Sequence, residues 1–382
     1  MTPAAGFICI VTVHGIGFQQ APDADAGIAG YADRLHQRLI PHLARLDLVL
    51  GSDPDPVRKG QVGPVYVQSH WPTDTRDREA GLVRLDKPLF DGHADVGHVA
   101  LVYSHLEDQG PQLEVTLETL GRTLLGAGAY VSPGALLHML VQDVRALRTP
   151  PQRTAEAPSG LLVRTELRHH QRALWHAMHL RPPEESAPPG LFGVLRALEN
   201  DVAAYVYRND LRERVRSFVR QSIFRLLARP DVTTLVVNSH SQGTVVVYDV
   251  LKDLSPADSK RISLLVTAGS PLRKYVDLFN WGADAGSAGG VEWRNFLDDC
   301  DPVADRLTPP ADWKRGDDLP KDADKTLFDV QHADGTTSPV RTEDTIVDNV
   351  ANSLGTDLRA HNYWDNDVDF VPRLARAIGG AG

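Results

Sequence analysis

The stretch TLVVNSHSQGTVVVYDVL, residues 234–251, decides the fold. It opens with a short apolar run rich in β-branched residues, which is typical of a strand buried in a parallel sheet. Its second half continues into an apolar stripe with helical spacing, made by Val247, Val250, Leu251 and Leu254. A strand that runs directly into a helix indicates an α/β architecture.

The joint between these two elements reads SHSQG, residues 239–243. A serine exposed on a tight turn from strand to helix needs a small residue two positions before it and another two positions after it. Gly243 meets the second requirement, and Ser239 stands at the first position. The pattern therefore predicts a nucleophile elbow centred on Ser241. In the alternative interpretation, the β-branched run Thr244–Tyr248 is a second strand and SHSQG is a hairpin turn.

Similar strand-like and helical segments alternate along much of the chain, which predicts a doubly wound, mostly parallel sheet. We expect strands at Phe7–Val13, Val62–His70, Thr234–Asn238, Ile262–Thr267 and Val291–Leu297, with Thr326–Gln331 extending the same sheet. We expect helices at Ile28–Leu46, Arg196–Ala228, with a break at Asn209–Asp210, and Asp367–Ile378.

The region 76–196 differs from the rest, because Leu-rich helical pieces alternate there with Pro-rich breaks. We expect residues 1–75 and 197–382 to form the α/β core and 76–196 to form a helical cap or lid inserted into it. Within the cap, Thr123–Gln142 carries no charged residue, and its Ser-Pro-Gly break favours two short helices over a membrane span. This segment either packs the cap against the core or makes peripheral contact with a membrane.

Composition excludes several classes of protein. The chain has 382 residues, with 40 basic and 50 acidic side chains and a net charge of −10, which argues against a nucleic-acid partner. Its 42% hydrophobic and 24% charged residues are those of an ordinary folded domain. Cys9 and Cys300 are the only cysteines, so no disulfide framework is expected. The first residues lack the basic start of a secretory signal, and we expect a cytoplasmic protein; oligomeric state is not predicted.

The first predicted strand ends in His14-Gly15-Ile16-Gly17, where the loop that forms an oxyanion hole would leave the sheet. Attack on an ester carbonyl places negative charge on oxygen, and fixed backbone N–H groups stabilise that charge. We expect the amides of Ile16 and Gln242 to supply these donors. The alternative is a dinucleotide-binding fingerprint, but its third glycine would fall at position 20, which is Gln20.

A nucleophilic serine needs a base and a carboxylate that orients the base. Asp298, Asp299 and Asp301 follow the strand predicted at Val291–Leu297, at the sheet edge where such enzymes carry their sites. We favour Asp301 as the acid, with Asp298 and Asp299 as alternatives. The competing interpretation of Asp301, which precedes a proline, is a helix cap or a solvated turn.

The base is expected after the acid, since the chain order in this kind of site is Ser, Asp, His. His361, just before the last predicted helix, fits that place, and His332 is the alternative. A metal site is not expected. The histidines at 169, 170, 176 and 179 are better explained as a solvated helix face, and we predict no cofactor.

The motifs HGIG, SHSQG, TAGSP at 267–271, WRNFLDDCDPV at 293–303 and HNYW at 361–364 together resemble serine lipases and esterases of the α/β-hydrolase superfamily. The chain looks most similar to the DDHD phospholipases and the inositol deacylases. The resemblance implies an α/β-hydrolase fold, with Ser241 as nucleophile, Asp301 as acid and His361 as base. It also implies that the amide after His14-Gly15 contributes to the oxyanion hole. Ser239 departs from the family, where glycine is usual.

We therefore expect a serine hydrolase that cleaves carboxylic esters, of lipids or other hydrophobic substrates, through an acyl-enzyme. Two alternatives remain open at this point. One is a hydrolase-fold binding protein without catalysis, and the other is a serine-dependent acyltransferase.

Overall fold

A computed structural model of the protein describes residues 6–15, 21–22, 29–56, 62–69, 81–90, 93–103, 205, 209–272, 288, 290–301, 303–304, 306–307, 329–331, 336–339, 342–353 and 359–381. The uncharged segment 123–142 and the four histidines between 169 and 179 lie outside these residues. In the described part of the chain, no helix has the length and apolar character needed to cross a bilayer.

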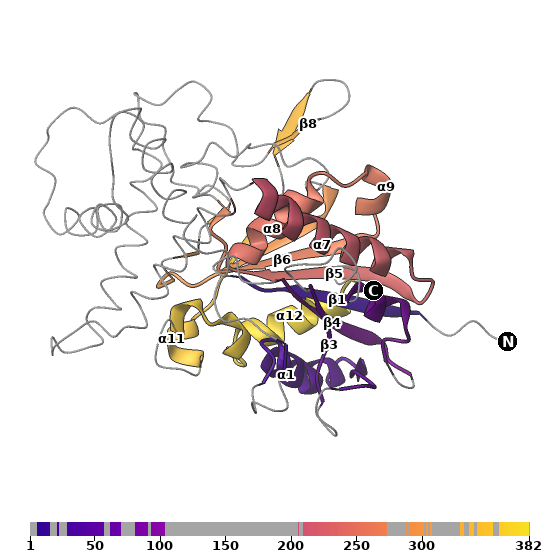
Figure 1. Ribbon diagram of the computed structural model, residues 1–382. Coiled ribbons are helices and arrows are strands. Elements are labelled where there is room, and N and C mark those ends of the chain that lie inside the picture. The colour runs from indigo at the N-terminus through magenta and orange to yellow at the C-terminus, as the bar shows by residue number, and fades with distance from the viewer. Residues whose placement is uncertain are drawn as a thin grey trace, which may run out of the picture.

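The core is an eight-stranded sheet in which every described strand pairing is parallel (Figure 1). The strands lie in the order β10-β7-β6-β5-β1-β4-β2, and β3 also pairs with β4. Their bounds are β1 Phe7–Val13, β2 Leu50–Gly51, β3 Val65–Gln68, β4 Val96–Val102, β5 Val232–His240, β6 Ile262–Ala268, β7 Glu292–Leu297 and β10 Thr342–Ile346. Because the strands are parallel, their carboxyl ends meet at one edge of the sheet.

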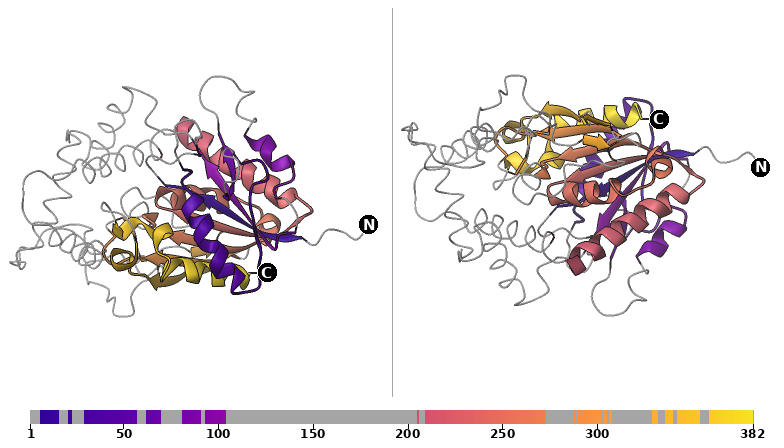
Figure 2. Two further views of the ribbon diagram at one scale, coloured as in Figure 1. Left: turned by 90° about the horizontal axis from the view of Figure 1, so that it is seen from below. Right: turned by 90° about the horizontal axis from the view of Figure 1, so that it is seen from above.

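Helices cover both faces of this sheet (Figures 1 and 2). One face carries α7 (Asn209–Ala228) and α8 (Gln242–Leu251), and the other carries α1 (Asp33–Ala44) and α12 (Phe370–Gly379). In β1, Cys9 and Val11 belong to the core on the α7 and α8 face, whereas Ile8 and Ile10 belong to the core on the other. Burial on both faces explains why β1 is a continuous apolar run.

Short elements complete the described structure. They are η1 Leu82–Asp86, α9 Pro256–Ser259, α11 Asn349–Asn352, η5 Arg359–His361, η6 Tyr363–Asp365 and an antiparallel pair of strands, β8 Asp329–Gln331 and β9 Thr337–Pro339. Three of them, α11, η5 and η6, lie between β10 and α12. The buried thiol of Cys9 and the half-buried thiol of Cys300 are both free.

The expected α/β class and the mostly parallel sheet are confirmed, and β1 has the bounds expected of it. Residues 242–251 form a helix, so the hairpin interpretation of SHSQG is wrong. The expected strand at 326–331 does not extend the main sheet, because β8 pairs with β9 and the polar strand β10 occupies the place beside β7. The helix expected at 196–228 is described from Asn209.

One strand lies inside the range expected to be a cap. Residues 96–102 form β4, which pairs along its whole length with β1 in the middle of the sheet. The preceding η1 also packs its Leu82 and Leu85 into the core beside α7. The boundary predicted at residue 75 therefore does not separate the sheet from the insertion, and the core continues to β4.

A chain of buried polar groups runs between β1, β4 and α1. The Nε2 atom of His98 lies 2.8 Å from Thr12 Oγ1, and its Nδ1 lies 3.3 Å from Nδ1 of His36, whose Nε2 lies 3.3 Å from Ser52 Oγ. Both histidines are fully buried. Burial lowers the pKa of His36 to about 4 and, together with the neighbouring His36, the pKa of His98 well below its usual value. Both imidazoles are therefore neutral in the folded protein at neutral pH.

This pair predicts that acid destabilises the fold. The unfolded chain takes up protons on these histidines below about pH 6.5, whereas the folded chain does not, so their contribution is complete above that pH and is lost as pH falls towards 4. The loss from His36 alone should be about 2 kcal/mol by pH 5. Urea unfolding at pH 7.5, 6 and 5 measures this loss, which His36→Gln should reduce. The control is His93→Gln, which replaces an exposed histidine outside this chain of polar groups. Equal loss in wild type and His36→Gln would contradict the prediction.

Candidate active site

The carboxyl ends of β1 and β5 lie side by side, and the chain leaves them in opposite directions. After β1 it continues to α1 on one face of the sheet, and after β5 it continues to α8 on the other. Such a reversal opens a crevice at the edge of a parallel sheet, and α/β proteins bind their ligands there. His14 and Gly15 follow β1, and Ser241 follows β5, so these predicted site residues meet at this edge of the sheet.

Ser241 stands between the last residue of β5 and the first residue of α8, with φ 54° and ψ −133°. A residue with a side chain rarely adopts such a conformation, and it persists only where the surroundings enforce it. Its N–H donates a hydrogen bond to the carbonyl of Ala268 at 3.0 Å, and its carbonyl accepts from the hydroxyl of Thr244 at 2.7 Å. Ser241 therefore stands at a tight turn from strand to helix with a positive φ.

Two glycines let the ends of β1 and β5 approach this closely. A Cβ atom on Gly243 would lie 2.2 Å from the carbonyl oxygen of His14, and one on Gly15 would lie 2.3 Å from Cβ of Ser241. Neither space can hold a side chain. Ser239 also fits its place, since it is fully buried and its hydroxyl donates to the carbonyl of Val266 at 3.0 Å.

The predicted oxyanion donors are described only in part. Gln242 is the first residue of α8, so its amide belongs to the helix N-terminus, where N–H groups have no partner within the helix. Ile16 and Gly17 lie outside the described residues. The residues before them contact Tyr103, which follows β4. The hydroxyl of Tyr103 donates to the carbonyl of His14 at 2.7 Å, and the imidazole of His14 stacks on the ring of Tyr103 with centroids 4.1 Å apart. The sequence analysis missed Tyr103.

Asp301 and His361 form a hydrogen-bonded pair. The Nδ1–H group of His361 donates to Oδ2 of Asp301 at 2.8 Å, and Oδ1 of Asp301 accepts from the N–H of Val303 at 2.9 Å. The carboxylate of Asp301 is fully buried. Burial alone would raise its pKa, but the charge of His361 and the hydrogen bonds to the carboxylate outweigh burial and lower the pKa. Asp301 is therefore ionised beside the imidazole.

The alternative acids lie elsewhere. Asp298 accepts hydrogen bonds from the N–H groups of Cys300 and Asn349, both at 2.6 Å, and so links the end of β7 to the start of α11. Burial raises the pKa of Asp298 to about 6, although these N–H donors oppose the shift. Asp299 is partly exposed and pairs with Arg306 at 3.4 Å. Neither contacts His361 through a described hydrogen bond, and the alternative base His332 lies outside the described residues.

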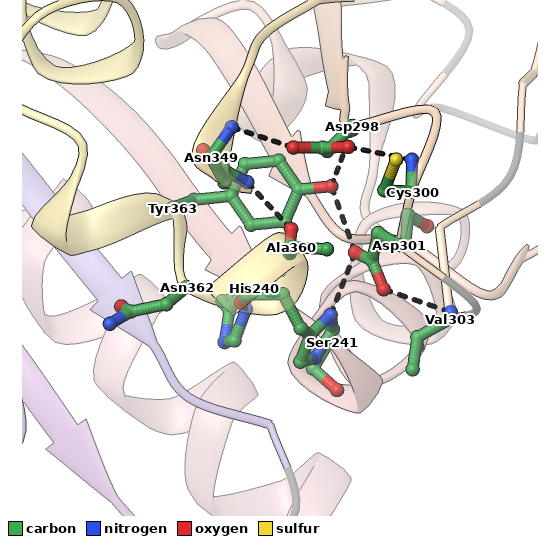
Figure 3. A network of polar contacts seen from close by, with 12 residues as sticks. His240, Ser241, Asp298, Cys300, Asp301, Val303, Asn349, Ala360, Asn362 and Tyr363 are labelled. Carbon is green, nitrogen blue, oxygen red and sulfur yellow. Dashed lines mark hydrogen bonds and ion pairs between the residues drawn. The ribbon is translucent and has the colours of Figure 1, made fainter. Parts of the chain in front are cut away.

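Tyr363 is a further residue that the sequence analysis missed. Its hydroxyl donates to Oδ2 of Asp301 at 2.8 Å and accepts from the N–H of Asp298 at 2.9 Å (Figure 3). The side chain is fully buried, and burial raises the pKa of the phenol well above its usual value. The phenol therefore stays protonated, and its O–H group donates a hydrogen bond to the carboxylate. Tyr363 lies within the HNYW motif, but no sequence pattern indicates a contact across 62 positions.

The contacts of Gly269 and His240 bring the imidazole of His361 to the elbow. Gly269 directly follows Ala268, whose carbonyl accepts the hydrogen bond from the Ser241 amide, and it has φ 62°. A Cβ atom on Gly269 would lie 2.7 Å from Cε1 of His361, so no side chain fits there. His240 donates from Nε2 to the carbonyl of His361 at 2.9 Å, and the two rings lie 4.4 Å apart. In the described part of the chain no hydrogen bond joins Ser241 Oγ to His361, a contact that often tightens only when substrate binds.

Two buried amides hold the loop that carries His361. Asn349 donates from Nδ2 to the carbonyl of Ala360 at 2.7 Å (Figure 3). Its Oδ1 accepts from Nδ2 of Asn366 at 2.9 Å. Asn366 in turn accepts from the N–H of Asp369 at 2.9 Å. Both amides are fully buried. The position of His361 is therefore set by α11 and by the turn before α12.

Comparison with protein-family models, with curated proteins and with solved structures finds no match for this chain. Among the described residues, no group of His, Cys, Asp and Glu side chains has the arrangement of a metal site.

The close approach at Gly243 predicts a strong effect of a single methyl group. Gly243→Ala would place Cβ against backbone atoms of His14 and Val13 that cannot move independently, and it should lower the free energy of unfolding by about 3 kcal/mol. Gly290→Ala is the matched control, because its Cβ would meet nothing within 4 Å, and it should change stability by about 0.5 kcal/mol or less. Urea unfolding measures both, and similar values for the two variants would count against the described packing.

The positive φ of Ser241 predicts that any residue with a Cβ atom at this position lowers the stability of the fold. Ser241→Gly should be more stable than Ser241→Ala by about 1 kcal/mol, because glycine adopts a positive φ without strain and alanine does not. Both variants lack the hydroxyl, so their difference isolates the backbone. Thermal unfolding of the pair measures it, and an alanine variant at least as stable as the glycine variant would show that no strain is stored there.

Proposed function

We propose that the protein is a serine hydrolase of the α/β-hydrolase fold, which cleaves carboxylic esters through an acyl-enzyme. The observation that carries the proposal is the positive φ of Ser241 at the crevice between β1 and β5, beside a buried Asp301–His361 pair. The chain order of Ser, Asp and His is that of the α/β-hydrolases. The positions of the three residues give further support, since each follows the carboxyl end of a strand in the same parallel sheet.

The chemistry follows from the tautomer of His361. Its Nδ1 carries the proton donated to Asp301, which leaves Nε2 of the neutral ring as a proton acceptor. In the proposed reaction, Ser241 Oγ attacks the ester carbonyl as its proton passes to Nε2, and Asp301 stabilises the imidazolium. The tetrahedral intermediate then expels the alcohol, which takes the proton from Nε2. Water attacks the acyl-enzyme by the same route and releases the acid and Ser241.

The amide of Gln242 is well situated for the oxyanion. It opens α8, where the helix dipole favours negative charge, and it directly follows the nucleophile. We propose the amide of Ile16 as the second donor, since the carbonyls of the loop before it are fixed by Tyr103.

We propose a hydrophobic ester, such as a lipid, as the substrate. The support is the resemblance to lipases and the uncharged segment 123–142 of the sequence. An acyltransferase would use the same acyl-enzyme and differ in the acceptor, so an added alcohol distinguishes the two by competing with water for the acyl group. Initial rates on p-nitrophenyl esters of graded chain length, beside phospholipids, determine the substrate preference.

Covalent labelling tests the proposal directly. A fluorophosphonate probe should label the wild-type protein, because an activated serine attacks phosphorus as it attacks an ester. Ser241→Ala should lose all labelling, and His361→Gln should lose at least about 100-fold in labelling rate. Ser263→Ala, on β6, removes a serine outside the site and should label like wild type. Folded wild-type protein that resists the probe over pH 6–9 would favour a binding protein without catalysis.

A further inference from the structure

The Asp301–His361 pair has a third member. Oδ2 of Asp301 accepts two hydrogen bonds, one from Nδ1 of His361 and one from the hydroxyl of Tyr363, each at 2.8 Å. The other carboxylate oxygen accepts from the N–H of Val303. The two side-chain donors therefore share the charge of one oxygen atom, in a place where no atom of the carboxylate reaches solvent.

The direction of the tyrosine hydrogen bond is fixed by its other partner. The phenol oxygen accepts from the N–H of Asp298 at 2.9 Å, so its own proton is directed to Asp301. The tyrosine ring is also held from the side, since it packs against Phe370 with ring centroids 5.8 Å apart. The hydroxyl is a fixed donor and does not rotate between partners.

We propose that Tyr363 is a positioning residue, whose hydroxyl sets both the orientation of the Asp301 carboxylate and the strength with which it holds the proton of His361. The catalytic meaning of this role rests on the proposed function, but the contact itself does not. A second donor on Oδ2 withdraws charge from the oxygen that faces the imidazole. Tyr363 therefore weakens the attraction between carboxylate and imidazolium while it fixes their geometry.

This role has a predicted sign. Without the hydroxyl, Asp301 places more negative charge on the oxygen that faces His361, and the imidazolium becomes more stable. Tyr363→Phe should then make the ring take up its proton at a pH higher by about 0.5–1 unit. Asp301→Asn removes the charge and should move the same event to lower pH. If Tyr363 only filled space, Tyr363→Phe would leave the pH of this event unchanged, whereas Asp301→Asn would still lower it.

A matched control lies elsewhere in the chain. The hydroxyl of Tyr66 donates to Oδ1 of the buried Asp33 at 2.8 Å and accepts from the N–H of Ala32 at 3.0 Å. Tyr66→Phe thus removes the same arrangement, a phenol between a buried carboxylate and a backbone N–H, without touching Asp301 or His361. It controls for the general cost of losing such a hydroxyl.

The experiment follows the ring of His361 by NMR in protein carrying ¹⁵N-labelled histidine, with His361→Gln to assign the signal. The pH titration is run on wild type, Tyr363→Phe, Tyr66→Phe and Asp301→Asn. We expect an upward shift in Tyr363→Phe, a downward shift in Asp301→Asn and none in Tyr66→Phe. In parallel, the acidic limb of the pH–rate profile should move upward in Tyr363→Phe, with kcat lowered about tenfold and KM little changed.

A second variant keeps the test valid where Tyr363→Phe unfolds. Replacing Tyr363 with 3,5-difluorotyrosine preserves the size of the side chain to within two fluorine atoms and makes the phenol a stronger donor. The His361 titration should then move to lower pH, opposite to the effect expected of phenylalanine. Shifts of the same sign in both variants, or no shift in either, would overturn the proposal.

The two proposals can fail separately. An unchanged titration in an enzyme that hydrolyses esters and reacts with the fluorophosphonate would overturn the role of Tyr363 and leave the proposed function intact. The expected shifts in a protein that neither hydrolyses esters nor reacts with the probe would support the role of Tyr363 and overturn the proposed function.

Discussion

The structure depends on the close approach of two backbone segments, the end of β1 and the turn between β5 and α8. Gly15 lies against Ser241, and Gly243 lies against His14, so neither position has room for a Cβ atom. Parallel strands reach such a distance only where both continuing chains turn away, which they do here towards opposite faces of the sheet. The contact forces Ser241 into its strained conformation, since the turn must complete itself between a buried strand and a helix that begins one residue later.

Burial of the neighbouring strands offsets the free energy that the strained turn at Ser241 costs. Strands β1, β5 and β6 are buried on both faces, and their apolar side chains divide between two separate cores. Burial of this kind supplies most of the free energy that holds a strained turn. On the other side of the crevice, polar contacts do the corresponding work, because Asp298, Asn349 and Asn366 connect three elements that carry or support Asp301 and His361. Apolar packing holds the turn at Ser241, and buried hydrogen bonds hold Asp301 and His361.

Sequence patterns predicted most of the strands that are buried on both faces, with β4 as the exception, and missed the polar edge strand β10. β1 has the expected bounds because each of its residues is apolar or small, whereas β10 reads TEDTI at the edge of the sheet and offers no apolar signal. β4, VGHVALV, carried a signal that was overlooked, and its His98 is polar because it belongs to the buried chain with His36 and Thr12. Ser241, Asp301 and His361 were predicted from a motif and from chain order. Tyr103 and Tyr363 were not, since a hydroxyl that reaches a distant carbonyl or carboxylate leaves no periodic pattern.

The pairing of β1 with β5 joins segments 226 positions apart, and His361 stands 120 residues after Ser241. Loops of that length close slowly, because the chain loses conformational entropy before the distant contact rewards it. We therefore expect β1 to pair with β5 late in folding. Until β1 takes its place between β4 and β5, the end of β1 does not meet the turn at Ser241, and nothing enforces the positive φ of that residue.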